Sequence, residues 1–183
     1  MRPVAVYHGG VFDRRIRVAE LIFRFLISAA ALLAALLLVT DTQVKQIFTI
    51  QKKAKFTDMK SLVILVVVNG MGAAYSVVQT IRCVVSMLRG GGSIVLFNKP
   101  LAWLVFCGDQ VMAYVMVGAT GAAAQSAAFA KLGEPQLQWM KVCDMYDSFC
   151  TQVGEAIATS VFATATTIIV SLISAFTLFR LYH

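Results

Sequence analysis

The segment Leu21–Val39 reads LIFRFLISAAALLAALLLV and is long enough to cross a bilayer as a helix. A hydrocarbon core about 30 Å thick needs about 20 apolar residues of helix. Further runs of this length are Leu62–Leu88, Leu101–Phe129 and Val153–Leu181. The runs are continuous rather than alternating, which favours helices over barrel strands, the other structure that satisfies its backbone in lipid. The sequence therefore predicts an all-α membrane protein built as a bundle of four transmembrane helices.

The segments between these runs are short. Of the 183 residues, 59% are hydrophobic and 14% are charged, and the mean hydropathy is +0.78. A soluble domain carries about 25% charged residues. No polar segment is long enough to bury a core of its own, so we expect a single membrane domain over residues 1–183. Its spans are expected at about 18–40, 62–88, 101–129 and 153–181.

The formal net charge of +7 comes from cations that flank the apolar runs. This distribution suits lipid headgroups, whereas nucleic-acid binders gather Lys and Arg on one face. We therefore expect membrane lipids, and no nucleic acid, as partners.

An even number of spans places both termini on the same side of the membrane. If that side is cytosolic, eight cations lie inside or at the inner boundary and seven lie outside, so the positive-inside rule alone decides little. Every arginine outside the spans falls on the terminal side, however, and Cys143 and Cys150 share a loop on the other, which suits an oxidising compartment. We therefore predict cytosolic termini.

The first loop, residues 41–61, is rich in lysine and contains the β-type residues Ile47-Phe48-Thr49-Ile50. This composition favours a short strand or hairpin at the outer surface.

Arg24 and Asp109 are ionisable residues inside predicted spans, where a charge is costly and is usually paired or functional. If the helices enter at Ile16 and Leu101 from the same side, each residue lies about 8 positions, or about 12 Å, into the membrane. We expect an intramembrane ion pair between them, in a network with Glu20, one turn before Arg24. The alternatives are snorkelling of Arg24 to the headgroups and a place for Asp109 beside a hydrated vestibule.

Glu155 begins the fourth predicted span near the outer face, and a carboxylate is favourable at a helix N-terminus. Gln152 and Thr159 share the helix face of Glu155. The alternative is therefore that Glu155 belongs to a polar network or site.

Small residues at four-residue spacing let membrane helices approach closely. Most such rows should pack the bundle itself, but there are more of them than one bundle needs, which favours association with other copies. The candidates for helix packing and oligomer contact are Gly70, Ala74, Gly118, Ala122, Ala163, Thr167, Ser171 and Ala175.

Cys143 and Cys150 lie close together in the third loop, where we expect a disulfide worth about 2–3 kcal/mol. No histidine lies nearby, so a zinc site is not supported. The sequence contains no phosphate-binding loop and no nucleophile–base pair. We therefore expect no catalytic residue, no metal and no cofactor.

Several segments resemble the plant Casparian strip membrane domain (CASP) family, which is similar to the MARVEL tetraspans of animal junctions. They are AKFTD at 54–58, VNGMGAAYS at 68–76, GDQVMAY at 108–114, and QWMKVC at 138–143 with Phe149-Cys150. The first loop lacks the acidic, Phe-rich signature of the founding Casparian strip proteins. The chain is therefore similar to a CASP-like member of the second subgroup.

The resemblance implies a multi-pass plasma-membrane scaffold that forms homo-oligomers, or hetero-oligomers with related family members, and organises cell-wall enzymes. The family's intramembrane Arg and Asp correspond to Arg24 and Asp109, and its loop cysteines to Cys143 and Cys150. Our leading hypothesis is a non-enzymatic scaffold. The alternatives are an oligomeric channel or transporter with Arg24 and Asp109 in its polar path, and an accessory subunit of a larger complex.

Overall fold

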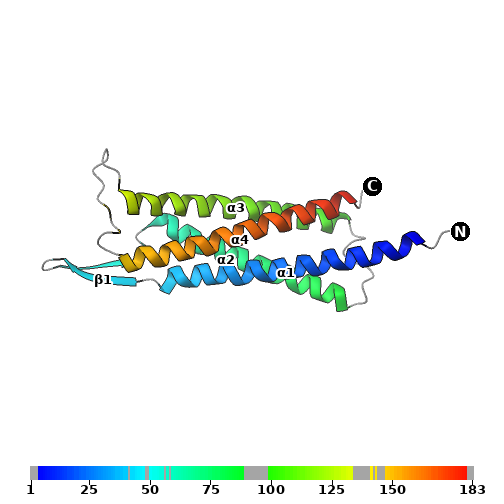
Figure 1. Ribbon diagram of the computed structural model, residues 1–183, viewed down its shortest axis with the longest axis horizontal. Helices are drawn as coiled ribbons and strands as arrows, with labels where there is room; N and C mark the ends of the chain where they lie inside the picture. The colour runs from blue at the N-terminus through cyan, green and yellow to red at the C-terminus, as the bar shows by residue number, and fades with distance from the viewer. Residues whose placement is uncertain are drawn as a thin grey trace.

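The computed structural model describes residues 4–40, 42–47, 50–55, 57, 59–88, 99–133, 141, 143 and 147–180. Its elements are α1 (Val4–Thr40), β1 (Thr42–Ile47), β2 (Ile50–Lys55), α2 (Lys60–Leu88), α3 (Lys99–Leu132) and α4 (Asp147–Arg180). The helices form an elongated bundle in which α1 begins and α4 ends at the same end (Figure 1). The predicted four-helix membrane fold is confirmed.

Each helix contains a stretch that is long and apolar enough to cross a membrane: Arg15–Thr40, Lys60–Val85, Pro100–Leu132 and Ser148–Phe179. Large apolar side chains stay exposed along all of them, among them Leu36, which is 60% exposed. Soluble proteins rarely expose such extended apolar surface, so lipid is the natural covering.

The helices extend beyond the predicted spans. The first begins at Val4 and the fourth at Asp147, both well before the apolar runs begin. Hydropathy marks where lipid begins, whereas helical backbone hydrogen bonds continue into the headgroup region and beyond. The last predicted span residue, Leu181, lies outside the described residues.

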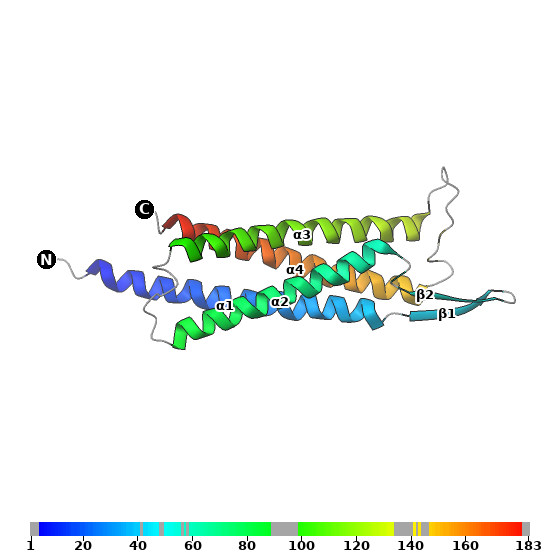
Figure 2. The same ribbon diagram turned by 180° about the vertical axis from the view of Figure 1, so that it is seen from behind.

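The helices are arranged so that α1 packs against α2 and α4. On the other side of the bundle, α3 packs against α4 and, less extensively, against α2. Helices α1 and α3 are therefore diagonal neighbours, and α2 runs obliquely across the bundle when seen from behind (Figure 2). Alanines with no exposed surface, including Ala31 and Ala34 on α1 and Ala156 and Ala163 on α4, line the interior and allow close packing.

A buried polar cluster ties three helices together near the middle of the bundle. Asn69 of α2 donates to the Ser160 hydroxyl of α4 at 3.1 Å. The Thr120 hydroxyl of α3 lies 3.0 Å from that of Ser160 and 3.2 Å from that of Thr164. Since lipid offers no hydrogen-bond partner, these groups are satisfied only when the helices are together.

The first loop contains the hairpin favoured by its composition. Strands β1 and β2 pair antiparallel, with Thr42 opposite Lys55 and Ile47 opposite Ile50. The hairpin continues along the long axis beyond the helix ends, at the end of the bundle away from the start of α1 (Figures 1 and 2).

We predict that Asn69→Leu lowers the free energy of unfolding in detergent by about 1–2 kcal/mol, because Ser160 loses one of its two buried side-chain partners and keeps only Thr120. Met71→Leu is the matched control, since Met71 is 49% exposed on the same helix. The loss of helicity during titration with a denaturing detergent measures the stability of both variants. Equal stability of the two variants would contradict a stabilising role for the cluster.

Candidate functional site

Arg24 and Asp109 form a bidentate ion pair across the bundle. The Arg24 Nη1 donates to Asp109 Oδ1 at 3.1 Å, and Nη2 donates to Oδ2 at 2.9 Å. Both residues are 1% exposed. The pair connects the diagonal helices α1 and α3, which otherwise contact each other little. The structure thus places the two predicted residues in contact and does not show Arg24 snorkelling.

The other two helices also reach the Asp109 carboxylate. The Tyr75 hydroxyl of α2 donates to Oδ1 at 2.9 Å, and the Ser174 hydroxyl of α4 donates to Oδ2. An ionised carboxylate has about four acceptor positions. Two bonds from Arg24, one from Tyr75 and one from Ser174 fill them, and each helix supplies one member of the cluster.

Glu20 links the buried pair to the terminal end of the bundle. The Arg24 Nε donates to Glu20 Oε1 at 2.9 Å, and Arg82 Nη2 of α2 lies 3.6 Å from the same oxygen. Glu20 and Arg82 are partly exposed, unlike Arg24 and Asp109. Two cations and two carboxylates thus balance one another, which lowers the cost of placing these charges in the membrane.

Glu155 does not belong to this network. The α4 residue that does reach Asp109 is Ser174, 19 positions away, or about 28 Å along a helix. Glu155 is exposed near the opposite end of the bundle. It also lies beyond the first turn of α4, which begins at Asp147 rather than near Val153. Both predictions for Glu155, a role at the helix N-terminus and membership of the polar network, are therefore wrong.

The predicted small-residue rows divide into buried and outward faces. The α4 row lies inside the bundle, since Ala163, Thr167 and Ser171 are buried and Ala175 is half-buried. On α2, Gly70 is half-buried and Ala74 exposed, and on α3 both Gly118 and Ala122 are exposed. The α4 row therefore packs the bundle, whereas the α3 row faces outward.

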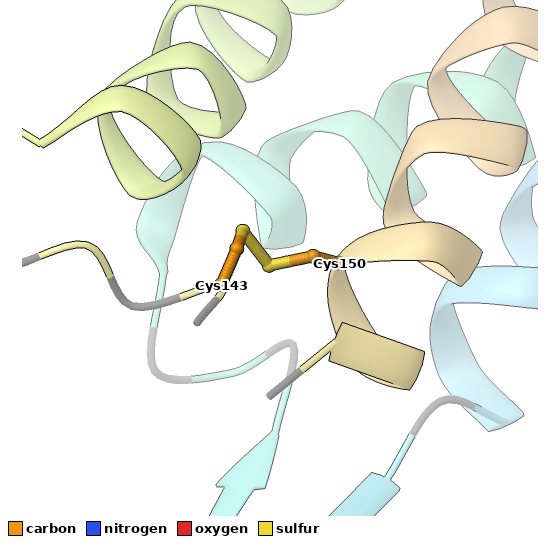
Figure 3. The surroundings of a disulfide bond; sticks show 2 residues. All are labelled: Cys143 and Cys150. Atoms are coloured by element: carbon orange, nitrogen blue, oxygen red, sulfur yellow. A yellow bond between two sulfur atoms is a disulfide. The ribbon is translucent and has the colours of Figure 1, made fainter. Parts of the chain in front are cut away.

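The predicted disulfide between Cys143 and Cys150 is present, with Cα atoms 5.6 Å apart. It joins the segment after α3 to the first turn of α4 (Figure 3). A hydrogen bond from Cys143 N to Ala130 O holds the same segment to α3. Helix α3 itself ends at Leu132 and is followed by Gly133, whose φ of 70° is favourable for glycine just past a helix C-terminus.

Gly108 makes room for Tyr75 beside Asp109. A Cβ at Gly108 would lie 2.6 Å from the Tyr75 hydroxyl oxygen, closer than any real contact. The glycine thus lets α2 and α3 approach closely enough for the hydroxyl to reach the carboxylate.

Arg24, Tyr75, Asp109 and Ser174 together form a clamp that holds the four helices to one another. A small cavity with room for about one water molecule adjoins it, lined by Arg24, Tyr75, Asp109 and neighbouring side chains. In the part of the chain that the structure describes, no three His, Cys, Asp or Glu side chains gather as metal ligands would. With its acceptor positions filled, Asp109 has little capacity to bind a passing cation.

Sequence reasoning missed Tyr75, Ser174 and the contact of Arg82 with Glu20. Tyr75 lies within one of the segments that carry the family resemblance, but its role depends on the space at Gly108. Ser174 is one of many Ser and Thr residues on α4. Only the rotation of α4 about its axis distinguishes it from the others.

The comparisons with known proteins identify the family. The model of the Casparian strip membrane protein domain matches residues 13–166. The chain belongs to the CASP-like proteins of subgroup 2B. Its similar relatives include CASP-like protein 2B1 of Ricinus communis, 60% identical over 98% of this chain and 89% of the relative. CASP-like protein 2B2 of Arabidopsis thaliana is 61% identical over 94% of this chain and 84% of the relative. No solved structure matches.

This membership confirms the resemblance stated from the sequence. The family model covers all members of the clamp except Ser174, which lies beyond its last residue. The match also supports a plant membrane protein with several spans.

We predict that Asp109→Asn lowers the free energy of unfolding of this CASP-like chain by about 3–5 kcal/mol, because Arg24 loses its buried counter-ion and keeps only Glu20, which is partly exposed and also faces Arg82. The double variant Arg24→Gln/Asp109→Asn should lose less than Asp109→Asn alone. Glu155→Gln, at the exposed carboxylate, should change stability by at most about 0.5 kcal/mol. Detergent unfolding measures all three. A double variant no more stable than Asp109→Asn would contradict the ion pair.

We predict that Gly108→Ala destabilises the bundle by about 1 kcal/mol or more, because the new methyl group displaces the Tyr75 hydroxyl from Asp109. The loss should be smaller in a Tyr75→Phe background, where the clashing oxygen is absent. Gly154→Ala is the control, since a Cβ there meets nothing within 4 Å. Additive effects of Gly108→Ala and Tyr75→Phe in unfolding measurements would argue against this coupling.

Proposed function

We propose that this chain is a non-enzymatic scaffold of the plasma membrane that associates with copies of itself and with related family members. The main support is that the intramembrane charges bind one another. Asp109 accepts hydrogen bonds from three other helices, so its coordination serves the bundle rather than a substrate. A channel or transporter needs polar groups that face a path and exchange partners. Family membership points in the same direction.

The proposed orientation places both termini in the cytosol and the hairpin on the outer side. It is supported by the disulfide, which lies at the hairpin end and suits an oxidising compartment (Figure 3). It also agrees with the arginines of the terminal end, including Arg15 and Arg17 on α1. The outer side is where partners among cell-wall enzymes would be met.

The outward face of α3 is the proposed contact between copies. Helix α3 is the least buried of the four spans. Gly118 and Ala122 are exposed one turn apart, and nothing would lie within 4 Å of a Cβ at Gly118. Small residues at this spacing allow a second helix to pack closely in lipid.

We predict that Gly118→Leu/Ala122→Leu weakens self-association about tenfold or more, because leucines prevent close helix approach. Ala158→Leu, an exposed alanine on α4, is the matched control. Ser171→Leu, by contrast, alters a buried residue and should destabilise the bundle itself. Energy transfer between labelled copies in liposomes, at several protein-to-lipid ratios, measures association.

Lateral mobility of a fluorescent fusion in a plant plasma membrane tests the wider proposal. Slow recovery in patches is expected for wild type, with faster recovery for Gly118→Leu/Ala122→Leu. Free diffusion of wild type as single copies would refute the scaffold. Unchanged patches in the double variant would exclude only the α3 face as the contact.

A further inference from the structure

The small cavity beside the clamp is enclosed by all four helices. Each helix contributes a polar residue to its lining: Arg24 from α1, Ser76 from α2, Asp109 from α3 and Thr167 from α4. These side chains are buried, with Ser76 3% and Thr167 6% exposed. Since lipid offers no hydrogen bonds, every polar group in this cavity needs a partner within the bundle.

The Ser76 hydroxyl makes no hydrogen bond within the part of the chain that the structure describes. The backbone carbonyl of Ser76 does accept one, from the Thr80 hydroxyl at 2.8 Å. On α4, by contrast, Thr164 and Thr167 each donate to the carbonyl four positions earlier at 2.8 Å, which is the usual local pattern. A buried hydroxyl without a partner is costly, and the adjoining cavity is where a partner can reach Ser76.

Arg24 also has hydrogen-bond donors that the clamp does not use. A guanidinium carries five N–H groups. One donates to Glu20 and two donate to Asp109, which leaves two on the Nη nitrogens. Because Arg24 is 1% exposed and the acceptor positions of Asp109 are filled, these two N–H groups require another acceptor.

Two hydroxyl oxygens at the cavity can still accept a hydrogen bond. Tyr75 donates its proton to Asp109 at 2.9 Å, and Thr167 donates its proton to the Ala163 carbonyl at 2.8 Å. Each of these oxygens keeps lone pairs. The lining of the cavity thus brings unused donors and unused acceptors together.

We propose that this cavity binds one water molecule, which completes the clamp. The water accepts hydrogen bonds from Arg24 and Ser76 and donates to the oxygens of Tyr75 and Thr167. A buried water makes about three hydrogen bonds on average, and the cavity has room for about one such molecule. The water joins α1, α2 and α4 beside the carboxylate that already joins them to α3.

The chemistry of the lining favours water over an ion. A cation would lie beside the Arg24 guanidinium and be repelled by it. A chloride ion is larger than a water molecule and would lie beside the Asp109 carboxylate. Water would bind in the same way whichever side of the membrane the termini face, and whether or not copies of the chain associate.

The competing arrangement is a dry cavity in which the Ser76 hydroxyl rotates to the carbonyl of Gly72 in its own helix. Cavities that remain dry are lined by apolar groups, however. The rotation would also leave the two N–H groups of Arg24 without an acceptor.

Crystal structures of the full chain in lipid test the water directly. In wild type we expect an electron-density peak within about 3.2 Å of Ser76 Oγ and of an Arg24 Nη atom. Ser76→Val should lose this peak, because it removes one partner and places a methyl group in the cavity. Thr80→Val is the matched control and should keep the peak, since it removes a hydroxyl one turn along α2 whose hydrogen bond goes to its own helix.

A second measurement needs no variant, so it remains decisive if Ser76→Val does not fold. In bilayers, nuclear magnetisation transferred from water should reach the labelled Nη nitrogens of Arg24, although Arg24 is buried. The methyl group of Ala31, which has no exposed surface and does not line the cavity, should receive none on the same time scale. Where Ser76→Val folds, it should reduce the transfer to Arg24 about fivefold or more, the effect of losing at least one hydrogen bond.

Three results would overturn the proposal. Wild type without the density peak, and with Ser76 bonded to the Gly72 carbonyl, would show a dry cavity. An anomalous signal in the cavity of crystals grown with bromide would show an anion instead of water. Retention of the peak in Ser76→Val, or transfer to Arg24 no faster than to Ala31 in wild type, would show that these side chains do not hold a water there.

Discussion

The Asp109 carboxylate holds the bundle together at one depth in the membrane. Arg24 reaches it from the diagonally opposite helix, and Tyr75 and Ser174 reach it from the remaining two. Neither charge could remain in lipid alone, since the desolvation cost of an unpaired buried ion is several kcal/mol. Docking of all four helices is therefore coupled to satisfaction of a single charged group.

The rest of the interior follows the same constraint imposed by lipid. Polar side chains lie inside, as in the cluster of Asn69, Thr120 and Ser160, while large apolar side chains face outward. Near the hairpin end, Gln152 of α4 donates to the Leu37 carbonyl of α1 at 2.8 Å. Because the hydrophobic effect does not drive helices together within lipid, these hydrogen bonds and the close packing of alanines carry the association.

Because the acceptor positions of Asp109 are filled, contacts with other molecules fall to the outer surfaces of the protein. The least buried helix, α3, carries an outward row of small residues. In the proposed function this row would meet neighbouring copies within the membrane. The row depends on a rigid bundle to present it, which links the structural role of Asp109 to the proposed function.

The sequence alone determined the number and length of the spans, because bilayer thickness sets the length of an apolar helix. It also favoured an Arg24–Asp109 contact, because both residues lie at similar depth and neither charge is tolerated alone, but it left open snorkelling of Arg24 and a hydrated place for Asp109. Only the tertiary structure decided that Tyr75 and Ser174 complete the clamp, that Glu155 lies outside it, and which small residues face inward. The physical reason is that helices this apolar all round carry no clear stripe, so their rotation about the axis is set by packing against neighbours.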